Sequence, residues 1–204
     1  MIKFDRCAEI DHLILTKLGK YVIKDRPKRW DGKAKAVLAF KKSILDKGLV
    51  IQSGKCGWCM LPVAADGRRT AHRDHIAPKA KHPEWTFLPI NLVIACEYCN
   101  GFAVKGDIDT VEIAAQSYGD CVFHVIHPYL DDPSLHLSFL AEEDDTKILI
   151  KSLSTKGSWT IKSLKLDTPG ATTERAKEYL HQQRMGSLPP PYGALLREAV
   201  LALG

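Results

Sequence analysis

Four of the six cysteines form two Cys-x-x-Cys pairs, and this spacing constrains the fold more than any other feature of the sequence. The first pair is Cys56 with Cys59, and the second is Cys96 with Cys99. Two such pairs can bring four thiolates into the tetrahedral arrangement that zinc takes in closed structural sites. The 36 residues between the pairs exceed the interval of about 15–20 residues in ordinary zinc ribbons. We therefore expect a substantial insertion between the two hooks.

Two other interpretations of these cysteines are weaker. Cys56-Gly57-Trp58-Cys59 resembles a redox dithiol, but no βαβ pattern surrounds it, and the second pair would stay unexplained. Disulfides do not suit the cytoplasmic location that the sequence favours. Cys7 and Cys121 have no matching partner in the sequence, and we expect buried apolar thiols at both positions.

The composition is that of an ordinary globular chain, with 204 residues, 45% of them hydrophobic and 26% charged. No apolar run approaches the roughly 20 residues that a membrane helix needs. The N-terminal residues lack the apolar block of a secretory signal. These features predict a cytoplasmic protein with no membrane association.

Charge is distributed unevenly along the chain. Residues 1–55 carry a net charge of +8, whereas residues 107–204 carry −5. A basic front suggests a polyanion such as nucleic acid as the partner of the first half. The acidic rear suggests either a second protein partner or simply a solvated surface.

The pattern of residues divides the chain into three regions and predicts an α+β fold. Residues 1–53 read as a basic helical region, with helices over 8–23 and from Asp31 to a stop at Gly48. Residues 54–107 form a loop-rich module that contains the cysteine pairs. Residues 108–204 form an acidic α+β region. Its predicted strands and helices are, in order, the strands 121–127, 135–140, 147–153 and 159–166 and the helices 171–184 and 192–203.

The insertion between the cysteine pairs contains residues suited to phosphate chemistry. Asp74 and His75 are adjacent, so one side chain can hold a hard cation while the other stays free to take a proton. Asn100 directly follows Cys99, which would fix it close to the zinc and let its carbonyl oxygen reach the same cation. A carboxylate, an amide oxygen, water and phosphate oxygens are typical Mg²⁺ ligands. A histidine near neutral pKa can deprotonate a water for attack on phosphorus.

The motifs in this region resemble those of HNH endonucleases with a ββα-metal fold. They are, in order, Cys-x-x-Cys, Asp-His-Ile-x-Pro, Asn-Leu-Val, Cys-x-x-Cys-Asn and Lys-Gly-Asp, and they span residues 54–107. The resemblance implies Mg²⁺-dependent hydrolysis of phosphodiester bonds in nucleic acid, usually DNA. It also implies a ββα core with a structural zinc bound by the four cysteines.

The resemblance assigns roles to individual residues. His75 would be the general base, and Asp74 and Asn100 would be Mg²⁺ ligands. Asn91 would brace the loop that carries the base. The Cys-Asn-x-x-Lys segment of the family is longer here, which weakens the assignment of Lys105 as a phosphate contact.

Cations close to His75 are candidates for substrate binding. Among them we expect Arg73 and Lys79 to contact phosphate through charge-assisted hydrogen bonds. His72 reads either as a second metal or phosphate contact or as a surface histidine, and the surface position is favoured.

The rear of the chain resembles the standalone HNH proteins of bacterial anti-phage systems of the Septu and retron-associated type. The segments that carry this likeness are His127–Pro133 and Trp159–Leu166. It implies a role in anti-phage defence beside an ATPase partner, which the acidic rear half would contact.

The alternative to a nuclease is a non-catalytic zinc module that binds DNA or protein.

Overall fold

The computed structural model of the chain describes residues 1, 3–65, 69–140, 148–187, 195 and 198. It has the predicted α+β character, with helices in the N-terminal region, small two-stranded sheets in the middle and helices toward the C-terminus. Among the described residues there is no helix with the length and apolar character needed to cross a membrane.

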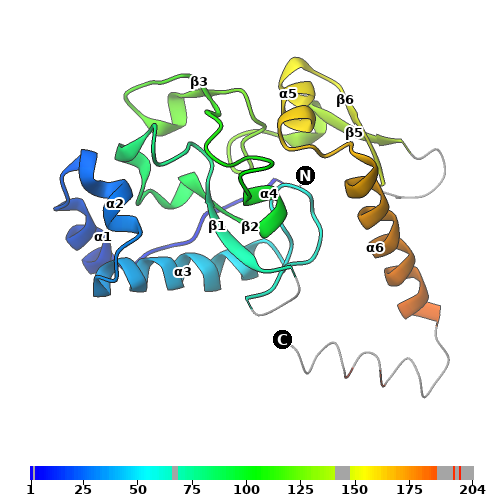
Figure 1. Ribbon diagram of the computed structural model, residues 1–204, viewed down its shortest axis with the longest axis horizontal. Helices are drawn as coiled ribbons and strands as arrows, with labels where there is room; N and C mark the ends of the chain where they lie inside the picture. The colour runs from blue at the N-terminus through cyan, green and yellow to red at the C-terminus, as the bar shows by residue number, and fades with distance from the viewer. Residues whose placement is uncertain (2, 66–68, 141–147, 188–194, 196–197, 199–204) are drawn as a thin grey trace.

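A short hairpin and the turn of helix after it form the centre of the molecule. Strands β1 (Ala71–His75) and β2 (Leu92–Cys96) pair antiparallel, and helix α4 (Glu97–Asn100) follows β2 directly. All five residues of β2 are buried. Helix α3 (Lys35–Ile51) lies along the hairpin at one edge of the molecule (Figure 1). The order strand, strand, helix is the one that the ββα resemblance implies.

Two glycines allow close packing on the two faces of β2. A Cβ atom on Gly48 of α3 would lie 2.6 Å from Cγ1 of Ile94, and one on Gly57 would lie 2.3 Å from Cγ2 of Val93. Successive residues of a strand point to opposite faces, so β2 is held between α3 and the turn of the first cysteine pair. The prediction that Gly48 ends the helix is wrong: α3 continues through it to Ile51, and the left-handed residues that follow the helix are Ser53 and Gly54.

The helix predicted over 8–23 is shorter in the structure, and the helix predicted from Asp31 begins later, at Lys35, because Asp31 ends helix α2 (Arg26–Trp30) instead of capping α3. Helix α1 (His12–Gly19) begins after Asp11, whose Oδ1 accepts a hydrogen bond from the Leu13 N–H at 2.7 Å. Helix α2 lies between the two helices that the sequence predicts in this region. Pro27 lies in its first turn, where a missing N–H costs no intrahelical hydrogen bond.

Two further hairpins follow the central one. Strands β3 (Val111–Ile113) and β4 (Val122–Phe123) form one, and β5 (Leu137–Leu140) and β6 (Leu149–Ser152) form the other. The predicted strand over 121–127 is therefore reduced to two residues. The strands predicted over 135–140 and 147–153 overlap β5 and β6.

The segment predicted as a strand over 159–166 begins in a helix instead. Helix α5 (Thr155–Ser163) starts at Ser154, whose Oγ accepts a hydrogen bond from the Gly157 N–H at 3.0 Å. The buried residues recur at helical steps of three and four: Gly157, Thr160, Ile161 and Leu164. Burial of these helically spaced positions therefore outweighs the local β-propensity of the apolar residues, and the segment forms a helix.

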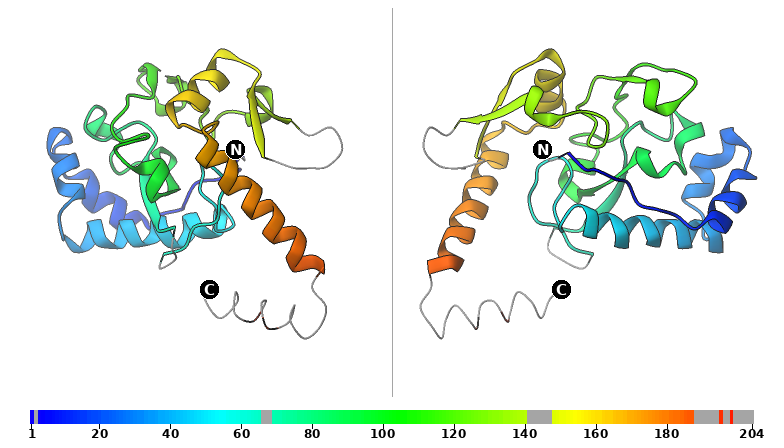
Figure 2. Two further views of the ribbon diagram at one scale, coloured as in Figure 1. Left: turned by 45° about the vertical axis from the view of Figure 1, so that its right-hand side comes forward. Right: turned by 180° about the vertical axis from the view of Figure 1, so that it is seen from behind.

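Helix α6 (Pro169–Ser187) contains the helix predicted over 171–184 and projects from the rest of the molecule (Figure 2). Arg175 anchors its first half, because its Nε donates to the Ile148 carbonyl and its Nη2 to the Leu166 carbonyl, both at 2.7 Å. The helix predicted over 192–203 lies outside the described residues, apart from positions 195 and 198.

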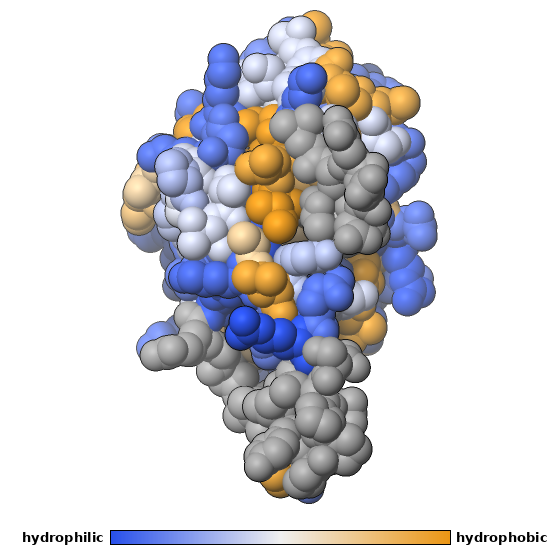
Figure 3. All heavy atoms as spheres, turned by 90° about the vertical axis from the view of Figure 1, so that its right-hand side faces the viewer, coloured by the Kyte–Doolittle hydropathy of each residue, from blue (hydrophilic) through white to orange (hydrophobic). Residues whose placement is uncertain are grey.

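The side of the molecule that bears α6, β5 and β6 exposes a strip of hydrophobic residues bordered by hydrophilic ones (Figure 3). Exposed leucines on this part of the chain include Leu149, Leu153 and Leu180.

Candidate functional site

The four paired cysteines converge into one buried cluster. Their sulfur atoms all lie within 4.8 Å of one another, and each side chain is buried. Cys59 Sγ and Cys96 Sγ are 3.9 Å apart, close to the edge of a tetrahedron built with Zn–S bonds of about 2.3 Å. A disulfide would need about 2.05 Å. The cluster is therefore consistent with a zinc site.

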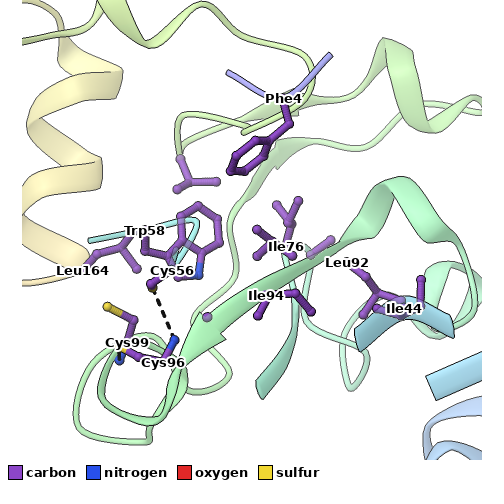
Figure 4. Close-up of a cluster of buried hydrophobic side chains, with 14 of the residues drawn as sticks. Phe4, Ile44, Cys56, Trp58, Ile76, Leu92, Ile94, Cys96, Cys99 and Leu164 are labelled. Carbon is purple, nitrogen blue, oxygen red and sulfur yellow. Dashed lines mark hydrogen bonds between the residues drawn. The ribbon is translucent and has the colours of Figure 1, made fainter. Parts of the chain in front are cut away.

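Backbone hydrogen bonds to sulfur fix the cluster from two elements. The Cys96 N–H donates to Cys56 Sγ at 3.3 Å (Figure 4). The Cys99 N–H donates to Cys96 Sγ at 3.5 Å. Such bonds stabilise thiolates, which are the form that binds zinc. Cys121 lies apart from the cluster, with its sulfur close to the carbonyl groups of Ala115 and Ser117. Cys7 is half-buried.

Asp74 lies on β1 and is buried, with 2% of its surface exposed. Its Oδ2 accepts a hydrogen bond from Trp58 Nε1 at 2.7 Å, and its Oδ1 accepts one from Lys105 Nζ at 2.8 Å. Burial raises the pKa of the Asp74 carboxyl, and the Lys105 ammonium opposes that rise. Because Trp58 lies between the two cysteines of the first pair, the carboxylate is tied directly to the cysteine turn.

Lys105 is also buried, with 1% of its surface exposed. Besides Asp74, its Nζ donates to the carbonyl oxygen of His75 at 2.6 Å. The ammonium therefore neutralises Asp74 and holds the end of β1. Contact between Lys105 and a substrate phosphate, which the sequence suggested, would require the ammonium to leave these partners.

His75 is the last residue of β1 and has 7% of its surface exposed. Its Nε2 lies 3.0 Å from the carbonyl oxygen of Thr86. A carbonyl only accepts hydrogen bonds, so Nε2 carries the proton and Nδ1 carries the lone pair of the neutral ring. Burial lowers the pKa of His75 to about 3. The ring also meets Trp30 edge to face, with 4.4 Å between centroids.

Asn91 braces the loop that follows His75 from a fully buried position. Its Oδ1 accepts from the Ala77 N–H at 2.8 Å, and its Nδ2 donates to the carbonyl oxygens of Ala77 at 3.1 Å and Trp85 at 3.2 Å. These contacts tie the residues after His75 to the segment that carries the Thr86 carbonyl. Asn91 thus lies where it can set the orientation of the His75 ring without touching it.

Two residues of the C-terminal region extend this network. Tyr118 Oη donates to Asn91 Oδ1 at 2.8 Å and lies 2.9 Å from Nε2 of His127. Nδ1 of His127 accepts from the backbone N–H groups of Tyr129 and Leu130, so the proton of the neutral ring is on Nε2 and points to Tyr118. Burial lowers the pKa of His127 to about 3, which keeps the ring neutral.

A cleft of about 540 Å³ brings most of the predicted residues together. The residues that line it include Asp74, His75, Asn100, Arg73, Lys79 and Lys105, whereas the buried Asn91 is not part of the lining. The sequence favours a surface position for His72, yet His72 also lines the cleft, and its Nδ1 lies 3.3 Å from Nδ2 of Asn100. The signal was available, because residues two apart on a strand share a face and His72 stands two before Asp74.

The two cations expected to bind phosphate already have protein partners at the rim of the cleft. Arg73 Nε donates to the carbonyl oxygen of Lys41 at 2.7 Å, and Lys79 Nζ lies 2.9 Å from Oδ2 of Asp31. The Lys79 pair is partly exposed, so water screens it and its net contribution to stability is small. Lys79 can exchange this partner for a phosphate at little cost.

The side chains around the cleft fit a divalent cation in part. Asp74 and Asn100 offer a carboxylate and an amide oxygen, which hard cations such as Mg²⁺ accept. His72 adds an imidazole, a ligand that suits transition metals better, and its two ring nitrogens lie 3.1 Å from Thr70 Oγ1 and 3.3 Å from Asn100 Nδ2. A carboxylate has about four lone-pair sites, so the two hydrogen bonds to Asp74 leave room for a ligand bond. The Lys105 ammonium works against a second cation at the same carboxylate. Among the described residues, the cysteine cluster is the one group of three or more His, Cys, Asp or Glu side chains close enough to hold a metal.

Comparison with known proteins gives a partial likeness. No model of a known protein family matches the chain. Over 90 residues, which are 44% of this chain, it is 36% identical to protein ea31 of Escherichia phage lambda. The match covers 26% of ea31, so this chain corresponds to about a quarter of that protein. The similarity is distant, and it does not carry the activity of the whole phage protein to this chain.

Proposed function

We propose that the chain is a metal-dependent endonuclease of the HNH type, with zinc at the four cysteines and a second divalent cation, such as Mg²⁺, in the cleft. The observation that carries this proposal is the cleft itself, which Asp74, His75 and Asn100 line together although they come from β1 and α4. The motifs in the sequence single out these three residues, and their shared position in one cleft supports the proposal.

The proposed role of His75 follows from its tautomer and its surroundings. The neutral imidazole accepts a proton at Nδ1 from a water, the water oxygen bonds to phosphorus, and the bond from phosphorus to the leaving oxygen breaks. A pKa of about 3 makes the free ring a weak base. A phosphate in the cleft strengthens it, because a nearby negative charge stabilises the imidazolium.

Asp74 and Asn100, joined by His72, would hold the cation in the cleft. The chemistry that bound Mg²⁺ supplies is polarisation of a phosphoryl oxygen and stabilisation of the charge on the leaving oxygen. Lys79 and Arg73 lie at the rim and would bind flanking phosphates. Asn91 would keep the Thr86 carbonyl in place to orient His75.

Replacement of His75 tests the nuclease assignment. His75→Ala is expected to abolish Mg²⁺-dependent cleavage of plasmid DNA while zinc content and the circular dichroism spectrum stay unchanged. The matched control is His12→Ala, an exposed histidine of α1, which should cleave like the parent protein. DNA and RNA substrates, each with and without chelator, belong in the same assay. Equal cleavage by the His75 variant would end the catalytic assignment.

The alternative function is a zinc module that binds nucleic acid or protein without cutting. The internal neutralisation of Asp74 by Lys105 and the low exposure of His75 favour this alternative. The two functions differ in one result: a binding module retains nucleic acid but shows no metal-dependent hydrolysis under any tested cation.

A role in anti-phage defence and a protein partner are further parts of the proposal. The acidic region 108–204 would contact an ATPase, as the resemblance of the rear segments implies. Affinity purification of the tagged chain from its native host tests this. We expect a stoichiometric ATPase in the eluate, and full activity of the isolated chain with no bound protein would contradict it.

A further inference from the structure

Phe102 differs from most phenylalanines of the chain. It has 99% of its surface exposed, whereas Phe4, Phe40, Phe87 and Phe123 have at most 7% exposed. Its position is also specific, because it lines the same cleft as Asp74, His75 and Asn100. A large aromatic ring left in water at the mouth of a polar cleft is therefore the most unusual surface feature next to the candidate site.

The turn that carries Phe102 is fixed at both ends. The N–H groups of Val104 and Gly106 both donate to the carbonyl oxygen of Gly101 at 3.0 Å, and the Lys105 N–H donates to the Cys99 carbonyl at 3.3 Å. Val104 and Lys105 are buried on the inner side of the turn. The ring is thus attached to the cysteine cluster on one side and to the Asp74–Lys105 pair on the other.

Gly106 lets this turn close. Its φ of +47° lies in the left-handed region that glycine adopts without strain, and a Cβ atom there would lie 3.2 Å from the Phe102 Cα. The tight turn therefore leaves no room on its inner side, and Phe102 projects outward. The chain positions the aromatic ring by backbone geometry rather than by contacts of the ring itself.

The cleft combines this ring with cations and with recessed reactive groups. Lys79 and Arg73 line it beside the ring, so cations and an aromatic surface stand together, as in sites that bind single-stranded nucleic acid by stacking and by backbone charge. The carboxylates of Glu97 and Asp107 line it as well, so stacking on the ring carries more of the expected affinity than net charge does. Asp74 and His75 are 2% and 7% exposed, so a phosphate must enter the cleft to reach them. A flexible strand with an unstacked base enters such a recess more easily than an intact duplex does.

We propose that Phe102 stacks on an unpaired base beside the phosphate in the cleft, and that the protein acts on single-stranded or locally opened nucleic acid. This inference rests on the proposed function and specifies its substrate. Every base has a π-face, so stacking on Phe102 supplies affinity without sequence preference. The cations at the rim add the salt-dependent part of the binding.

Binding can be measured apart from cleavage in the full-length, zinc-loaded chain that carries His75→Ala. The probe is a short single-stranded DNA oligonucleotide with a 3′ fluorophore, titrated by fluorescence anisotropy. Adding Phe102→Ala is expected to weaken binding by roughly tenfold, within the range measured for loss of one base–aromatic contact. Phe102→Tyr and Phe102→Trp keep a ring and should bind within about twofold of the parent. Leu135→Ala, at a residue 68% exposed outside the cleft, is the matched control and should change nothing.

A second probe reports stacking directly. Oligonucleotides with 2-aminopurine at successive positions should show a fluorescence change on binding at one position, and Phe102→Ala should abolish that change. Unaltered single-strand affinity of the Phe102→Ala variant would overturn the inference, as would an equal loss for a fully paired duplex. Metal-dependent cleavage with no effect of Phe102→Ala would refute the stacking alone. Phe102-dependent binding with no cleavage by the wild-type chain would refute the nuclease and leave the stacking surface standing.

Discussion

Removal of the Lys105 ammonium is the sharpest test of how this site is built. Lys105 and Asp74 form an ion pair of 2.8 Å in which both side chains are at most 3% exposed. Lys105→Met keeps most of the side-chain volume but leaves the carboxylate buried without its counter-charge. Breaking a buried pair in this way costs about 3–5 kcal/mol of the free energy of unfolding. The loss of the hydrogen bond to the His75 carbonyl acts in the same direction.

The effect should depend on pH with a definite sign. Burial raises the pKa of Asp74 in the folded chain, and this pKa should rise further when the Lys105 ammonium no longer opposes the effect of burial. A carboxyl with a raised folded-state pKa stabilises the folded state below its unfolded-state pKa. That stabilisation is lost as pH rises from the unfolded-state pKa through the folded-state pKa. The free-energy difference between variant and parent should therefore be larger at about pH 8 than at about pH 5.

The assay is urea unfolding followed by circular dichroism, with zinc present and no other divalent cation. Lys42→Met is the matched control, because Lys42 forms an ion pair with Asp46 at 2.6 Å but is 76% exposed. Its removal should cost about 0.5 kcal/mol or less. A cost below about 1 kcal/mol for Lys105→Met, or a cost that does not shrink at low pH, would refute the buried-pair reasoning.

Two further variants test the supports of the site. Cys99→Ser should lose zinc and unfold the cysteine module, as measured by atomic emission and circular dichroism, whereas Cys121→Ser should keep its metal; a stable, metal-free Cys99 variant would contradict this. Tyr118→Phe leaves the buried His127 Nε2–H without its acceptor and removes one donor from Asn91, so it should lower the free energy of unfolding by about 1–3 kcal/mol; an unchanged urea midpoint would show that the network contributes nothing.

The arrangement ties the candidate site to structural parts on every side. Trp58 connects Asp74 to the first cysteine pair, and Asn100 follows the second pair directly. Metal binding at the cysteines would therefore organise the cleft as well as the fold. A chain stripped of zinc should lose the geometry of Asp74 together with the cysteine cluster.

Local sequence patterns determined the parts of this protein that depend on short-range geometry. The Cys-x-x-Cys spacing sets two thiols on one turn, and the cluster formed as predicted. Asp74 and His75 are adjacent on β1, so their side chains diverge wherever the strand lies. The α+β character also followed from the periodicity of apolar residues.

Tertiary structure decided everything that required distant segments to meet. Lys105 pairs with Asp74, which lies 31 residues earlier in the chain, and Tyr118 donates a hydrogen bond to Asn91, which lies 27 residues earlier. No local sequence pattern predicts these contacts. Residues 159–163 are helical because the helix buries Thr160 and Ile161 against the core, a tertiary contact that the local sequence pattern does not reveal. Burial itself is a property of the whole fold, and it governs the pKa values of His75 and Asp74. Sequence therefore supplied the reactive groups, and packing supplied their charge states and their partners.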